Sequence, residues 1–189
     1  MSLGWRLYKK IVKIHHIFSS PEHNYFTREK FDIGTAPTLE HHSVVLEVGK
    51  GIKDDRFEFS KYPITLLSLE VAEEVCKELE LPLALKIFRR NIIISGVHLN
   101  SLIGEEFTLG GIKFRGLAHC APCPWMNAVM KKGAYSLMRG RGGLSVEVLS
   151  SGKVFREETY IESRVGLEES PLKALKLVNL SSLNSALSL

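Results

Sequence analysis

The chain has 189 residues, of which 44% are hydrophobic and 24% are charged, the composition of an ordinary globular protein. This length suits one domain followed by a tail, and we place the domain at residues 1–165 and a helical tail at residues 166–189. Three cysteines, an odd number, argue against a secreted disulfide framework, and no apolar run approaches the roughly 20 residues of a membrane span. We therefore expect a cytoplasmic protein with no membrane segment.

The formal net charge at pH 7 is only +4, but the positive charge is concentrated at several points. Solvated surface is the ordinary role of such residues, and together they suit a small phosphorylated ligand. The chain has no basic strand interleaved with aromatic residues and no recognition-helix pattern, so we expect no nucleic-acid partner. The basic points are Lys50 with Lys53, Arg89 with Arg90, Lys131 with Lys132, and Arg139 with Arg141.

Strand-like runs dominate the chain, and they are apolar and β-branched at residues 10–18, 43–48 and 91–95. Many short strands separated by turn residues predict a mainly β fold, either a sandwich or a barrel.

Two hairpins are predicted in the second half of the chain. The first covers residues 106–115 and turns at Gly110-Gly111, where glycine supplies the positive φ angles of a two-residue loop. In the second, residues 144–149 pair with residues 153–160 across Ser151-Gly152.

Two helices interrupt the strands. Ser68 is a suitable N-cap for the first helix, with Glu70 in its first turn. Cys76 falls on the apolar face of this helix, so we interpret it as a small core residue. The apolar face repeats at i, i+3, i+4 and i+7 through Ala72, Val75, Cys76 and Leu79.

The second predicted helix begins at Pro124, whose missing N–H is no loss at the first helical position. Cys123 would then be its N-cap, Lys131-Lys132 would lie in its last turn, and Gly133 would end it. A third helical stretch is predicted from Ser170 onward.

Cys120 and Cys123 lie three residues apart in the run HCAPCPWMN, which permits three interpretations. A zinc site normally needs four nitrogen or sulfur ligands, and the chain has no second pair of this kind. A dithiol redox centre has its first cysteine at a helix N-terminus within a βαβ unit, whereas this pair lies among hairpins.

The third interpretation is one reactive thiol at Cys123. At an N-cap the thiol faces free backbone N–H groups and the positive end of the helix dipole, which favour the thiolate. The alternative is an inert cysteine in a strand-to-helix turn, and spacing alone leaves the two open.

Six ordered pieces between residues 11 and 162 resemble one family, the MOSC domain. This domain is the C-terminal module of molybdenum-cofactor sulfurases and also occurs as small stand-alone bacterial proteins. The pieces are 51–57 (GIKDDRF, similar to G-x-x-G-D-R-H), 65–70 (TLLSLE), 91–96 (NIIISG, similar to N-i-v-v-s-G), 102–110 (similar to L-x-x-G-x-x-F-x-x-G), Pro122-Cys123 at the family's cysteine, and 140–143 (GRGG) with Ser151-Gly152.

The resemblance implies a mainly β fold, a β-barrel like that of pyruvate kinase, with a few helices. It also implies that Cys123 carries persulfide sulfur or ligates the molybdenum of a pterin cofactor. The sulfur would come from a separate pyridoxal-phosphate cysteine desulfurase, whereas other relatives use the cofactor to reduce N-hydroxylated compounds. The candidate cofactor-binding residues are Arg56, Arg89, Arg90, Arg139 and Arg141, with Asp55 to orient a ligand or cap a turn and Asn91 to hold a ligand or backbone.

The chain departs from the family pattern in the first and the last of these pieces. Phe57 replaces the expected histidine, Asp54 replaces a glycine, and no G-D follows Gly152. A non-catalytic binding module on the same barrel is therefore the alternative to a molybdenum-cofactor protein, and a C-x-x-C dithiol protein is a further one.

Overall fold

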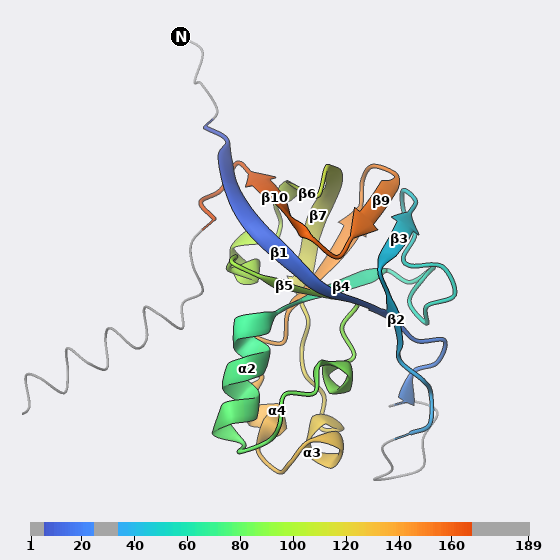
Figure 1. Cartoon of the computed structure of the whole chain (residues 1–189), viewed down its shortest axis with the longest axis vertical. Helices are drawn as coiled ribbons and strands as arrows, with labels where there is room; N and C mark the ends of the chain where they lie inside the picture. The colour runs from blue at the N-terminus through green and yellow to red at the C-terminus, as the bar shows by residue number, and fades with distance from the viewer. Residues whose placement is uncertain (1–5, 25–33, 168–189) are drawn as a thin grey trace, which may run out of the picture.

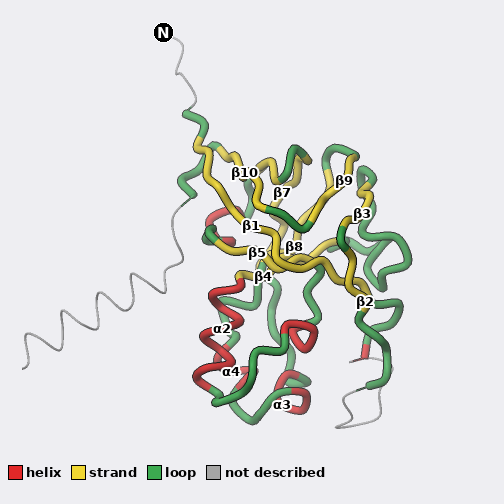
Figure 2. Tube along the Cα trace, viewed as in Figure 1, coloured by secondary structure: helices red, strands yellow, loops and turns green. Residues whose placement is uncertain are grey.

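The computed structural model describes residues 6–24 and 34–167, which form a mainly β structure with short helices gathered at one end of a barrel (Figure 1). The strands are β1 (Tyr8–Ser19), β2 (Leu39–His41), β3 (Ser43–Leu46), β4 (Ile64–Ser68), β5 (Ile92–Ser95), β6 (Glu106–Leu109), β7 (Ile112–His119), β8 (Leu144–Val148), β9 (Gly152–Phe155) and β10 (Glu158–Ser163). The helices are α2 (Leu69–Glu78), α3 (Met126–Val129) and α4 (Ala134–Leu137), with 3-10 turns η1 (Leu85–Phe88) and η2 (Leu99–Leu102) (Figure 2).

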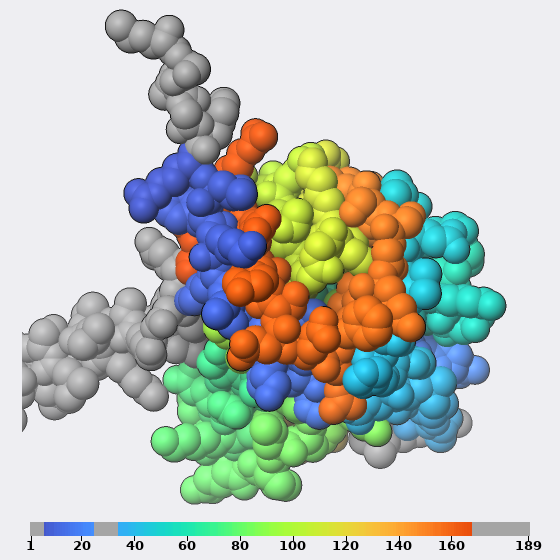
Figure 3. All heavy atoms as spheres, turned by 45° about the horizontal axis from the view of Figure 1, so that its top comes forward, coloured from blue at the N-terminus to red at the C-terminus, as the bar shows by residue number. Residues whose placement is uncertain are grey.

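Within the described residues, seven strands close in the order β1, β5, β4, β8, β7, β6 and β10, and β10 pairs with β1 again. The closing seam runs antiparallel from Tyr8 opposite Ser163 to Lys13 opposite Glu158. These first and last strands lie side by side on the surface (Figure 3). The predicted mainly β barrel is confirmed.

The apolar residues form two clusters that share strand β4. Ile64 and Leu66 belong to the cluster that includes the barrel interior, whereas Leu67 belongs to a cluster with α2, α3 and α4. All five residues of β4 are buried, because one face of the strand meets the barrel core and the other meets the helices. This two-sided burial explains why apolar residues of the strand, such as Leu66 and Leu67, are adjacent in sequence instead of alternating with polar ones.

The hairpin at residues 106–115 is confirmed, with φ of 60° at Gly110 and 80° at Gly111 between Leu109 and Ile112, which face each other. The second predicted hairpin is wrong. Strand β8 pairs with β4 and β7, while β9 pairs with β3 and β10 pairs with β1 and β6. Local turn chemistry at Ser151-Gly152 marks a reversal of the chain, but the partners of the strands are set by distant segments.

Helix α2 forms as predicted. The hydroxyl of Ser68 accepts a hydrogen bond from the N–H of Val71 at 3.3 Å, which caps the helix. Cys76 is only 3% exposed in the helical cluster, where burial raises the pKa of its thiol. It is therefore the core residue that the sequence predicts.

The predicted helix from Ser170 and most of the predicted tail lie outside the described residues. No helix in the described part of the chain combines the length and the apolar character needed to cross a membrane.

Asn91 joins three segments through one buried amide. Its oxygen accepts hydrogen bonds from the N–H (3.0 Å) and the hydroxyl (2.8 Å) of Thr65 on β4. Its nitrogen donates to the carbonyl of Phe18 on β1 (3.1 Å) and to the carboxylate of Asp55 (3.2 Å). The side chain therefore holds backbone at the start of β5, as the sequence suggests, and fixes the loop that contains Asp55.

We predict that Asn91→Ala lowers the free energy of unfolding by at least about 2 kcal/mol, because each buried group left without its hydrogen bond costs about 1–3 kcal/mol. Urea denaturation measures the change. Asn100→Ala is the matched control, since its amide donates to the Gly140 carbonyl near the surface. A loss as small as that of the control would show that the network adds little to stability.

Candidate functional site

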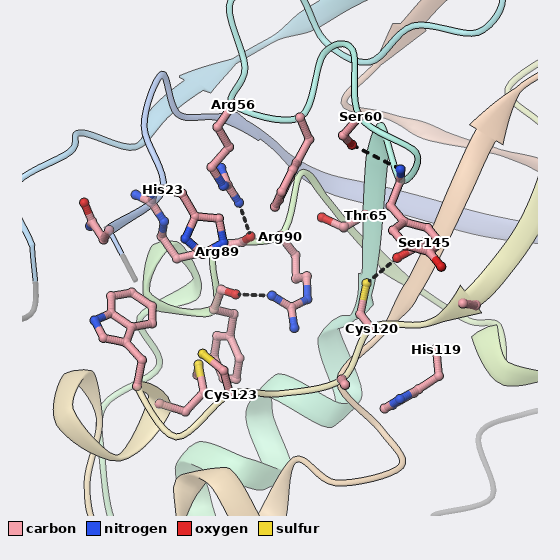
Figure 4. Close-up of a pocket in the computed structure, with 18 of the residues that line it drawn as sticks. His23, Arg56, Ser60, Thr65, Arg89, Arg90, His119, Cys120, Cys123 and Ser145 are labelled. Carbon is pink, nitrogen blue, oxygen red and sulfur yellow. Dashed lines mark hydrogen bonds between the residues drawn. The ribbon is translucent and has the colours of Figure 1, made fainter. Parts of the chain in front are cut away.

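A hollow of about 640 Å³ lies between the barrel and the helices (Figure 4). Its walls come from β4, β7 and β8, from η1 and α3, and from the loops that precede and follow them. Apolar and aromatic side chains, such as Phe88, Trp125 and Met126, provide much of the lining. Both cysteines of the C-x-x-C pair belong to the same lining.

Apart from two cysteines and Tyr62, the ionisable side chains of the described lining are basic. Among the described residues that line the hollow, none is Asp or Glu. Positive side chains in a partly enclosed, partly apolar site attract anions more strongly than they would at an open surface. The basic residues are His23, Arg56, Lys61, Arg89, Arg90 and His119.

Arg56 is held within the wall. Its side chain is 7% exposed, with Nη1 3.3 Å from the Asp55 carboxylate and Nη2 donating to the Arg89 carbonyl at 2.8 Å. The guanidinium also lies 4.6 Å from the centre of the Phe57 ring. Burial lowers the pKa of Arg56 to about 10, against the opposing effect of Asp55, so the group stays charged at pH 7.

Arg89 closes η1 in the left-handed conformation, with φ of 55°. Its guanidinium donates to the carbonyls of Ala36 (3.2 Å) and Glu22 (2.6 Å) and to the hydroxyl of Thr38 (3.1 Å). Arg89 therefore binds two other segments to the wall while its charge still contributes to the hollow.

Arg90 has donor capacity left for a ligand. Its Nε donates to the carbonyl of Gly142 at 2.8 Å and its Nη1 to the carbonyl of Phe88 at 3.0 Å. Its second amino group, Nη2, has no hydrogen-bond partner among the described residues. Of the predicted arginines, Arg90 is thus the one whose geometry best suits direct contact with an anion.

Asp55 and Asn91 do not line the hollow but support its wall. Asp55 is 5% exposed and accepts the N–H groups of Ser20 (2.8 Å) and Phe57 (3.0 Å) as well as the Asn91 amide. The carboxylate is therefore directed at protein donors, which matches its interpretation as a turn cap.

Arg141 and Arg139 also lie outside the lining. Arg141 donates to Glu74 (3.1 Å) and Glu78 (3.2 Å) of α2, and Arg139 is exposed. The structure thus brings Arg56, Arg89, Arg90 and Cys123 together in one lining and leaves Arg141 outside it, paired with α2.

The predicted cap at Cys123 is wrong. Helix α3 begins at Met126, with Trp125 at its N-cap, and it has four residues. Pro124 and Trp125 form a turn instead, in which the N–H of Met126 bonds the carbonyl of Cys123 at 3.0 Å. Pro suits the second position of such a turn as well as the start of a helix, and one helical turn has little dipole to offer a thiolate.

The predicted end of this helix is wrong as well. Residue 130 already lies beyond α3, so Lys131 and Lys132 are outside it. Gly133, with φ of 105°, precedes Ala134 as the N-cap residue of α4 rather than ending α3. Two short helices therefore replace the single one predicted.

The two cysteines differ in their surroundings. Cys120 is 8% exposed, and its sulfur lies 3.0 Å from the hydroxyl of Ser145, toward which it points in Figure 4. Cys123 is partly exposed and sits apart from this contact, lower in the hollow in the same view. Cys123 is therefore the more accessible thiol of the pair.

The glycines of residues 140–143 permit a close approach to the cysteine segment. A Cβ at Gly142 would lie 2.1 Å from the carbonyl oxygen of Cys120, and one at Gly143 would lie 2.1 Å from that of Leu66. The carbonyl of Gly143 also accepts the N–H of Cys120 at 2.8 Å. The glycine-rich piece of the sequence thus fixes the path of the chain as it leaves β7.

Arg90 and His119 hold the same glycine from two sides. The N–H of Gly142 donates to Nε2 of His119 at 3.0 Å, and its carbonyl accepts from Arg90. A neutral His119 therefore keeps its proton on Nδ1. Burial, reinforced by Arg90, lowers the pKa of His119 below its ordinary value.

Sequence reasoning missed several lining residues, chiefly His23, Lys61, Thr65, His119 and Ser145. Ser145 and Thr65 face each other across β8 and β4, and both are buried. Thr65 interrupts an apolar strand, which is a detectable signal, whereas Ser145 and Glu147 alternate with apolar residues as outward-facing positions do. His23 has no such local signal, because it comes from a separate segment.

In the part of the chain that the structure describes, no three His, Cys, Asp or Glu residues are grouped so as to hold a metal ion by themselves.

The described residues thus combine a closed barrel, a cationic hollow and a cysteine after β7. Residues 22–162 match the model of the MOSC domain family. The match covers most of the chain, which therefore belongs to that family. No curated protein matches the chain.

Solved structures share the fold at low sequence identity. The YuaD protein from Bacillus subtilis is 15% identical, with a TM-score of 0.68 over 85% of this chain and 100% of that one. YiiM from Escherichia coli is 14% identical, with a TM-score of 0.58 over 84% and 72% of the two chains. YiiM from Geobacillus stearothermophilus is 14% identical, with a TM-score of 0.57 over 80% and 74%.

We predict that Cys123 reacts first with an alkylating agent, because Cys76 and Cys120 are buried. Mass spectrometry of the native protein at short reaction times identifies the modified residue. Denatured protein, in which all three thiols are accessible, is the control. Earlier modification of Cys120 would show that the Ser145 contact opens readily and that exposure does not decide reactivity.

Proposed function

We propose that the hollow binds a molybdenum–pterin cofactor and that Cys123 is the protein thiolate for its metal. The observation that carries this proposal is the combination, in one hollow, of an accessible thiol with basic side chains and no lining carboxylate among the described residues. A pterin cofactor carries a phosphate and brings its own ligands to molybdenum, so it needs from the protein cations and one soft donor.

The residues of the hollow fit a molybdenum–pterin cofactor. Thiolate sulfur suits a soft metal better than carboxylate oxygen does. Arg90 offers a free amino group, and the planar guanidinium matches phosphate geometry. The apolar wall of Phe88, Trp125 and Met126 suits the flat ring system.

Once bound, the cofactor would supply redox or sulfur chemistry at its metal. The residues of the chain would hold its phosphate at Arg90, shield the ring from water and keep the Cys123 sulfur accessible. The reactions consistent with this site are sulfur transfer, with sulfur delivered by a separate pyridoxal-phosphate cysteine desulfurase, and reduction of N-hydroxylated compounds.

A second candidate is a non-catalytic binding module on the same barrel. Phe57 favours it, because an apolar ring packs against Arg56 and His23 where the family motif has a histidine. Such a module would bind an anion in the hollow without any requirement for the Cys123 sulfur.

We predict that Cys123→Ser abolishes molybdenum uptake, whereas Cys120→Ser retains it, because a serine at position 120 can still bond Ser145. The protein is produced in a host that synthesises molybdopterin, and molybdenum per protein is measured by elemental analysis. Equal loss in both variants, with a Cys120–Cys123 disulfide under mild oxidant, would support the dithiol alternative. Undiminished anion binding with no molybdenum in the wild type would support the non-catalytic module.

We predict that Arg90→Gln weakens binding of the isolated cofactor about tenfold or more, since a hydrogen bond to a charged group contributes about 1.5–3 kcal/mol. Arg141→Gln is the matched control, because that guanidinium pairs with Glu74 and Glu78 outside the hollow. A fluorescence titration of the apo proteins gives both affinities. Equal weakening in the two variants would mean that general charge, rather than the hollow, attracts the ligand.

A further inference from the structure

His23 enters the hollow from a segment far in sequence from the predicted site. Its ring packs edge-on against Phe57, with the ring centres 5.5 Å apart, and both residues line the hollow. Phe57 in turn lies on the guanidinium of Arg56. An imidazole is thus present beside Arg56, although position 57 itself has none.

The charges around His23 are mostly positive. Arg56, Arg89 and Arg90 all oppose its protonation, and burial does so most strongly, so its pKa lies below the ordinary value. Of the carboxylates, Glu22 directly precedes His23 and is exposed, and Asp55 is bonded to Arg56 and to backbone donors. The other ionisable groups of the described lining are His119, Lys61, Tyr62, Cys120 and Cys123.

A bound anion reverses this balance. A negative ligand among the arginines favours the protonated imidazole, so the complex takes up a proton that the empty protein does not hold. By linkage, affinity for the anion then rises as the pH falls. Because His23 is mainly neutral in the empty hollow at neutral pH, the affinity for the anion increases when the pH is lowered.

We propose that His23 is an anion-binding residue of the hollow and that it contacts, in its protonated form, the phosphate ester group held by the arginines. The proposal rests on the proposed function for the identity of the ligand. It gives the hollow an affinity that depends on pH, and it assigns to residue 23 the imidazole that the sequence motif leads one to expect at residue 57.

Inorganic sulfate is the probe, because its charge is constant between about pH 5.5 and 8, the range in which histidine titrates. Binding to the apo protein is measured by calorimetry at both ends of this range, with ionic strength held constant by chloride. The wild type should bind sulfate roughly tenfold more tightly at the lower pH, as expected for one added charged hydrogen bond. In His23→Gln the change should fall below about twofold.

His119→Gln is the matched control, because it removes the other imidazole of the lining. It should keep the pH effect. The double variant His23→Gln/Phe57→His should recover part of the effect, which a purely structural role of His23 would not produce. Melting temperatures without sulfate at the higher pH check the fold, and His23→Asn is used if the glutamine variant does not fold.

An undiminished pH effect in the folded His23 variant, or its loss in His119→Gln alone, overturns the proposal. Absence of sulfate binding by the wild type also overturns it. That last result is separate from the failure of cofactor binding, which is measured by molybdenum content.

Discussion

The buried amide of Asn91 is the interaction on which the site depends most. It hydrogen-bonds Thr65, Phe18 and Asp55 and so connects two barrel strands with the loop that carries Arg56. Because Asp55 in turn holds Arg56, the position of one wall of the hollow follows from the hydrogen bonds of one uncharged side chain. A motif residue that looks like a ligand-binding group thus acts through the backbone that it organises.

The second feature of the site is an excess of positive charge near a thiol. Three arginines line one hollow, and Asp55, the carboxylate bonded to Arg56, is outside that lining. Like charges held together in a partly buried site destabilise the empty protein, and they do so less when an anion is present. The arginines remain in place because their other donors bond backbone carbonyls, such as those of Arg89, Glu22 and Gly142.

Much of the fold could be predicted from sequence, because the signals were local. Gly110-Gly111 and Ser68 each determine a turn or a cap within a few residues. The partners of β8 and β9 could not be predicted from Ser151-Gly152, because pairing depends on strands from the first half of the chain. Among the residues that line the hollow, the motifs contain Arg56 and Cys123, and Arg89 and Arg90 were predicted as cations next to a motif. His23 has no local pattern, and Pro124 is compatible with both a turn and a helix start.

The seam between β1 and β10 also decides when the barrel can form as the chain leaves the ribosome. Residue 8 pairs with residue 163, so this edge of β1 stays unpaired until the chain has been synthesised as far as β10. Contacts this distant in sequence slow folding and leave strand edges exposed meanwhile. The lysines at positions 9, 10 and 13 place positive charge along the unpaired edge of β1, which disfavours pairing between incompletely folded chains.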